Sequence, residues 1–179
     1  MMADTSIFNT RAPYHITALG LLTGTQFFQS FVGGVVAYKA LPRSQFSQLQ
    51  QKIFPVYFSI QTVLPVLIAI TYPGPVGKAS GIKGVFENRH SVLIPISIIL
   101  VTSSLNLLLV GPATTKAMRD RKVQETRDGK KYTDPGPHSE EMQRLNSLFS
   151  KLHGISSLLN LMGFISTISY SFTLARRIV

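Results

Sequence analysis

The stretch SVLIPISIILVTSSLNLLLVGP at residues 91–112 decides the fold, because it contains no Lys, Arg, Asp or Glu along its whole length. An α-helix of about 20 apolar residues is long enough to cross the hydrocarbon core of a bilayer. Three further stretches share this property, at residues 15–38, 53–72 and 152–175. A helix at the surface of a soluble protein would carry a charged face. The sequence therefore predicts an all-α integral membrane four-helix bundle.

The composition agrees with a membrane protein and excludes several functional classes. Only 15% of the residues are charged and 45% are hydrophobic, whereas about a quarter of a soluble domain is charged. The chain has no cysteine, which excludes disulfides, thiolate metal sites and cysteine nucleophiles. No two histidines are three or four residues apart, and no carboxylate lies within a span. We expect no catalytic site, no metal and no cofactor.

The spans divide the chain into a polar N-terminal tail at 1–14, a transmembrane domain at 15–176 and a basic tail at 177–179. The connection at 39–52 is short and basic, and the one at 73–90 is rich in Gly and Pro. The third connection, 113–151, is expected to be partly helical on both sides of a turn-forming centre at 128–138. Ser139 followed by two glutamates is typical of a helix start. This connection is the predicted amphipathic cytosolic extension between the third and fourth helices.

The basic residues predict the orientation of the bundle. The connections 39–52 and 113–151 hold twelve Lys and Arg, against six in the N-terminal tail, the connection 73–90 and residues 176–179. Positive loops tend to face the cytosol, so we expect the first and third connections there. Their basic side chains are expected to contact anionic lipid, foremost among them Arg43, Lys52, Arg119, Arg121 and Lys122. A nucleic-acid partner is not expected, because no basic face with interleaved aromatic residues is present.

Small and polar residues within the spans have several interpretations. Gly20, Gly24, Gly33 and Ala37 have the spacing that lets two helix backbones approach closely. Packing within the bundle is the first interpretation; a ligand path and a homodimer interface are the alternatives. In the second span, Pro65 removes the hydrogen bond to the carbonyl of Gln61 and is expected to kink the helix. A hinge or a polar pocket at that point is the alternative.

The third and fourth spans carry the most informative polar residues. Asn106 and Asn160 are costly to expose to lipid, so both are expected to point inward from facing helices and to pair. His153 is interpreted as an interfacial hydrogen-bonding residue, with proton handling or metal binding as alternatives. The candidate polar cluster consists of Asn106, Thr114, Thr115, His153, Ser156, Ser157 and Asn160.

Three blocks in order resemble the transmembrane protein 205-like family. They are SFVGGVVAYKALPRSQFSQLQQKIFPVYF (30–58), NLLLVGPATTKAMRDRK (106–122) and KLHGISSLLNL (151–161). The chain departs from the family at Gly111, where animal members tend to have an acidic residue before the proline. The resemblance implies a four-span membrane fold with no established enzymatic activity. It also implies an endomembrane or mitochondrial (outer) membrane location and marks the candidate polar cluster as part of a shared site at the cytosolic end.

Two functions remain open at this point. The first is a noncatalytic membrane organiser that binds lipid or a protein partner, with a homodimer or another membrane protein as candidates. The second is a carrier of a small solute, a lipid, or a drug or metal complex that acts through the polar cluster. An enzyme that uses His153 with Thr115 or Ser157 ranks last, because no second titratable group accompanies the histidine.

Overall fold

A computed structural model describes residues 8–74 and 77–176, and every regular element in these ranges is a helix. The elements are α1 (Ala12–Phe27), η2 (Phe28–Gly33), α2 (Gly34–Ala40), α3 (Arg43–Ile70), α4 (Gly81–Glu87), η3 (Arg89–Leu93), α5 (Ile94–Leu105), η4 (Asn106–Val110), α6 (Gly111–Asp128) and α7 (Glu140–Ala175), where η denotes π-helix. Consecutive elements join into four rods that are long and apolar enough to cross a membrane: Ala12–Ala40, Arg43–Ile70, Arg89–Asp128 and Glu140–Ala175. The predicted all-α, four-span architecture is confirmed.

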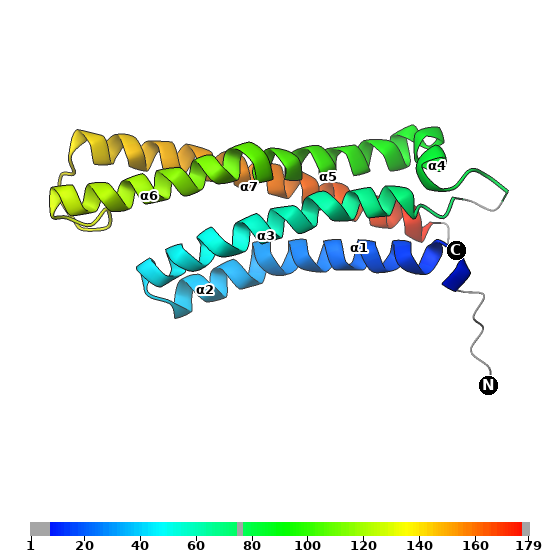
Figure 1. Ribbon diagram of the computed structural model, residues 1–179, viewed down its shortest axis with the longest axis horizontal. Coiled ribbons are helices and arrows are strands. Elements are labelled where there is room, and N and C mark those ends of the chain that lie inside the picture. The colour runs from blue at the N-terminus through cyan, green and yellow to red at the C-terminus, as the bar shows by residue number, and fades with distance from the viewer. Residues whose placement is uncertain (1–7, 75–76, 177–179) are drawn as a thin grey trace.

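The four rods run side by side and differ in length (Figure 1). Both described termini and α4 lie at one end, while the α2–α3 turn and the α6–α7 hairpin lie at the other. The third rod has 40 residues, which is about 60 Å at the helical rise of 1.5 Å per residue and about twice the hydrocarbon thickness. The α6–α7 hairpin therefore extends past the α2–α3 turn. We call this end of the bundle the hairpin end and the opposite one the terminal end.

Helix boundaries differ from the predicted ones where charged residues lie in helices. The predicted connection 39–52 is mostly helix, because α3 begins at Arg43 and only Leu41 and Pro42 separate it from α2. Its basic residues, Lys39, Arg43 and Lys52, interrupt the apolar stretches and had indicated a connection instead. The predicted loop 73–90 contains the short helix α4, and the predicted tail 1–14 ends inside α1, which starts at Ala12. The rest of that tail before residue 8, and the tail 177–179, lie outside the described residues.

The packed core lies toward the terminal end. Its fully buried side chains come from all four rods and include Leu22, Ile68, Ile99 and Tyr170. His15 is also buried there, with its Nε2 2.7 Å from the hydroxyl of Tyr170. The hairpin end has no comparable cluster among the described residues. Apolar packing thus fills the bundle at the terminal end.

The sequence predicted that small residues on the first rod allow close helix packing within the bundle, and this prediction is wrong. A Cβ on Gly20 or Gly24 would meet nothing within 4 Å, and both residues are exposed. They line a shallow groove between α1 and α3 instead. Gly33 approaches only side chains of its own rod, and Ala37 is half-buried. The close helix approach lies at Gly163, where a Cβ would meet Thr102 Oγ1 at 3.0 Å.

Two of the π-helical stretches immediately precede prolines in the third rod. η3 ends just before Pro95 in α5, and η4 ends just before Pro112 in α6. Proline cannot donate the α-helical hydrogen bond, and π-turns accommodate such interruptions within a continuous helix. In η4 the Gly111 amide donates to the Asn106 carbonyl, and a Cβ on Gly111 would lie 2.5 Å from that oxygen. A glycine is therefore needed at this turn.

We predict that Gly163→Leu destabilises the bundle, because the new side chain must separate α7 from α5. Overpacking of this kind costs about 1–3 kcal/mol, which thermal unfolding in detergent would measure. Gly154→Leu is the matched control on the same helix, where a Cβ meets nothing within 4 Å. Equal melting temperatures for the two variants would contradict the close approach at Gly163.

Candidate functional site

A hydrogen-bonded group of amides and hydroxyls joins three rods in the middle of the bundle. Asn160 Oδ1 accepts from the Tyr57 hydroxyl at 2.8 Å and from Gln61 Nε2 at 3.1 Å. Asn160 Nδ2 donates to Ser30 Oγ at 2.7 Å. Gln26 Nε2 in turn donates to Gln61 Oε1 at 3.0 Å. We call these five residues the polar hub; it links the first rod, α3 and α7.

The polar hub changes the interpretation of Gln61. The sequence linked this residue to a kink at Pro65, with a polar pocket as the alternative. α3 is continuous through both Pro55 and Pro65, and the buried Gln61 side chain bonds to two other rods. No lipid group can satisfy an amide at this depth, so such bonds hold the rods together. The kink itself stays a prediction.

The two asparagines point inward as predicted, but they do not pair. Asn106 is 1% exposed, and its Nδ2 donates to the backbone carbonyl of Ser156 at 3.2 Å. The amide of Asn160 is occupied by the polar hub. The predicted Asn106–Asn160 bond is therefore wrong, because nearer hydroxyl, amide and carbonyl groups outcompete it.

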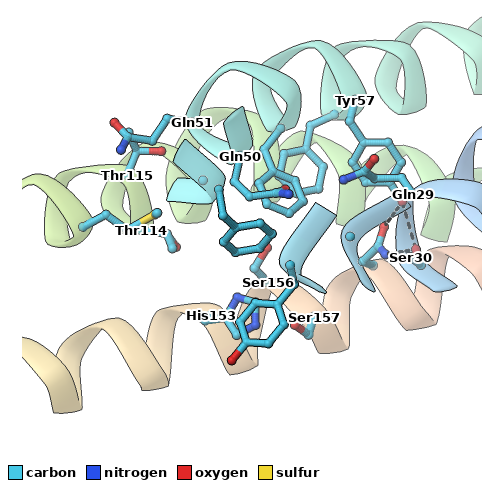
Figure 2. A pocket seen from close by; sticks show the side chains of 18 of the residues that line it. Gln29, Ser30, Gln50, Gln51, Tyr57, Thr114, Thr115, His153, Ser156 and Ser157 are labelled. Carbon is cyan, nitrogen blue, oxygen red and sulfur yellow. Dashed lines mark hydrogen bonds between the residues drawn. The ribbon is translucent and has the colours of Figure 1, made fainter. Parts of the chain in front are cut away.

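A cavity of about 520 Å³ lies beside the polar hub, toward the hairpin end. Its walls come from η2, α2, α3, α6 and α7, so both helix pairs that diverge in Figure 1 contribute to it. Figure 2 shows Gln50 in the middle, with Thr114, Thr115 and Gln51 on one side and Tyr57, Gln29 and Ser30 on the other. His153, Ser156 and Ser157 line the α7 side.

The structure brings six of the seven predicted cluster residues to this cavity. Its lining includes Thr114, Thr115, His153, Ser156, Ser157 and Asn160. Asn106 does not line the cavity, but its side chain donates to the backbone carbonyl of Ser156, which does. The predicted polar residues thus line one partly open cavity, although they come from positions about 40 residues apart in α6 and α7.

Sequence reasoning missed most of the aromatic lining and the central glutamine. Aromatic walls are formed by Phe31, Tyr38, Phe46, Phe54, Tyr57, Phe58, Phe149 and Phe164. Phe54 and Phe58 stack with an interplanar angle of 15°. The family resemblance marked Phe54, Tyr57 and Phe58 as candidates for the shared site, but aromatic residues are ordinary in membrane spans, and nothing in the sequence distinguished the other five. Gln50 was missed because it lay in a stretch that was interpreted as a loop.

His153 lies at the mouth of the cavity with an aromatic neighbour. Its ring stacks on Phe149, with 5.7 Å between ring centroids and 4° between ring planes, and the residue is exposed. Among the described residues, no group of three or more His, Cys, Asp or Glu could hold a metal ion. The imidazole ring of His153 therefore forms a flat part of the cavity lining with polar atoms at its edge.

The five basic residues predicted at the membrane surface divide into two groups. Arg43, Lys52, Arg119 and Lys122 are exposed. Arg121 is the exception and corrects the prediction, because it is only 8% exposed. Its guanidinium carbon lies 3.8 Å from the ring centroid of Tyr132 and 4.5 Å from that of Phe149. Cation–π contacts of this type make Arg121 a packing residue of the α6–α7 hairpin.

We predict that Asn160→Ala lowers the free energy of unfolding by about 1–3 kcal/mol, because the Gln61 amide and the Tyr57 hydroxyl lose their shared acceptor. Chemical denaturation in detergent micelles would measure the loss. Asn146→Ala is the control, since Asn146 is half-buried on the same helix outside the polar hub. A loss no larger than that of the control would show that the hub does not hold the rods together.

Comparison with known proteins gives the chain a family. The family model described as "Domain of unknown function (DUF4149)" matches residues 17–123. Xanthocillin biosynthesis cluster protein D of Aspergillus fumigatus is 33% identical over 175 residues, which cover 98% of this chain and 96% of that protein. Transmembrane protein 205 of Danio rerio is 25% identical over 166 residues, which cover 84% of each chain. No solved structure matches.

The family match runs through the first three rods, and the Aspergillus relative extends the similarity over nearly the whole chain. The similarity to transmembrane protein 205 confirms the resemblance found in the sequence blocks. The chain is a multi-pass membrane protein that belongs to the family of the domain of unknown function DUF4149.

Proposed function

We propose that this protein binds a small, neutral and largely apolar molecule in the cavity and serves as a noncatalytic membrane carrier for it. The supporting observation is the cavity itself, which lies where the predicted polar residues converge. An organiser that acts only through its surface needs no such space. The lining among the described residues contains no Lys, Arg, Asp or Glu, and an ion without a countercharge would be costly there.

The kinds of groups that line the cavity also support the proposal of binding rather than catalysis. They are amides, hydroxyls, aromatic rings and the single imidazole of His153. General acid–base chemistry commonly uses a positioned titratable pair, and the described lining offers no carboxylate or amine beside His153.

The alternative role of a membrane organiser is supported by features of the protein surface. Arg119 and Lys122 on α6 and Arg43 at the start of α3 are exposed at the hairpin end, where anionic lipid would attract them. We propose that this end faces the cytosol from an endomembrane or the mitochondrial outer membrane. The open groove at Gly20 and Gly24 leaves room for a homodimer or a membrane-protein partner on the first rod.

Binding is tested by filling the cavity from α7. We predict that Ser157→Phe weakens binding of 2-methoxynaphthalene, a neutral aromatic probe, by at least tenfold, because the new ring occupies the space of the ligand. The fluorescence of the probe can be followed directly, since the chain has no Trp. Ser169→Phe is the control at an exposed position of the same helix that does not line the cavity. Identical titrations for the two variants and the wild type would refute the cavity as the site.

Orientation is tested with single cysteines, which the cysteine-free chain makes simple. Thr133→Cys lies in the exposed tip of the α6–α7 hairpin and Lys78→Cys in the connection at the terminal end. We predict that an impermeant maleimide added from the cytosolic side labels the first and not the second. The reverse pattern would place the hairpin end in the lumen or the exterior.

A further inference from the structure

Gln50 is the one cavity-lining side chain whose buried amide has no partner on either atom among the described residues. It is 4% exposed, and both Nε2 and Oε1 lack hydrogen bonds. The buried amide of Gln61 and the half-buried amide of Asn160 are bonded to other rods. Buried polar groups are nearly always satisfied, so an orphaned amide requires an explanation.

The position of Gln50 suggests what satisfies it. Its side chain lies in the middle of the cavity, between the threonines of α6 and the polar hub (Figure 2). A ligand in the 520 Å³ space would meet this amide on entering. The apolar alternative at the same place, a leucine or methionine, would fill the wall without leaving a donor and an acceptor unpaired.

The chemistry of the amide limits the class of ligand. A primary amide offers one acceptor and two donors, so its best counterpart is a group that also presents a donor beside an acceptor. The stacked rings of Phe54 and Phe58 and the parallel pair of Phe149 and His153 offer flat surfaces to an aromatic body. The absence of charged side chains in the described lining favours a neutral molecule.

We infer that Gln50 is the specificity-determining residue of the cavity, and that the ligand is a neutral aromatic molecule with a carboxamide or lactam group. The two amides bind each other through a pair of hydrogen bonds while the aromatic body lies against the phenylalanine walls. This inference rests on the proposed function, because it names the ligand class of the same cavity.

The test compares two probes of similar size that differ in one group. 2-Naphthamide has a donor and an acceptor, whereas 2-methoxynaphthalene has an acceptor only. The full-length wild type in detergent should bind 2-naphthamide about tenfold more tightly than 2-methoxynaphthalene, and Gln50→Met should bring the ratio of the two affinities close to one. Gln48→Met, at an exposed position on the same helix outside the cavity, should keep the preference.

A stability measurement without ligand separates recognition from a structural role. Removing an unpaired buried amide relieves an unfavourable group, so Gln50→Met should melt no lower than the wild type. A lower melting temperature, together with loss of both probes, would make Gln50 a structural residue and overturn the inference.

The two proposals fail in different ways. If 2-methoxynaphthalene binding responds to Ser157→Phe but 2-naphthamide shows no Gln50-dependent preference, the cavity stands as the site and the inference about Gln50 is wrong. If neither probe responds to Ser157→Phe, the proposed function itself fails.

Discussion

The hydrogen bonds of Asn160 are the interaction on which the rest of the bundle depends. Within a membrane, water cannot compete for these groups, and hydrocarbon packing alone does not favour one helix arrangement strongly. The side chain of Asn160 binds Ser30 on the first rod and Tyr57 and Gln61 on α3. Three rods are therefore fixed at one level, and the packing on either side of that level is free to differ.

The packing differs between the two sides of Asn160, and this asymmetry positions the site. On the terminal side, apolar side chains from all four rods fill the space, and the buried His15 is held by Tyr170. On the hairpin side the helix pairs diverge (Figure 1), and a cavity replaces the core. The α6–α7 hairpin compensates for the divergence with its own contacts, in which Arg121 packs between Tyr132 and Phe149. The open end is thus supported without closing the cavity.

The spans and the inward-facing polar residues could be predicted from the sequence, because they depend on composition. The hydrogen-bond partners of those residues could not. Absence of charge located the spans, and the cost of polar groups in lipid identified Asn106, Asn160 and the serines of α7. The partner of each amide depends on helix rotation and depth, which one sequence does not specify, so the Asn106–Asn160 bond was wrong. Arg121 was assigned to the membrane surface for a related reason, since only tertiary contacts with Tyr132 reveal its burial.

The amides of Gln61 and Asn160 differ from that of Gln50 in their hydrogen bonding, and this contrast bears on what the cavity binds. Gln61 and Asn160 are satisfied within the chain, so their cost is offset whether or not the cavity is filled. Gln50 has no hydrogen-bond partner among the described residues, and an apolar residue at the same place would leave no donor or acceptor unpaired. On the inference made above, Gln50 gains a partner when the ligand binds. The bonds of Asn160 hold three rods together, and the unpaired Gln50 amide beside them is where the inferred ligand would bind.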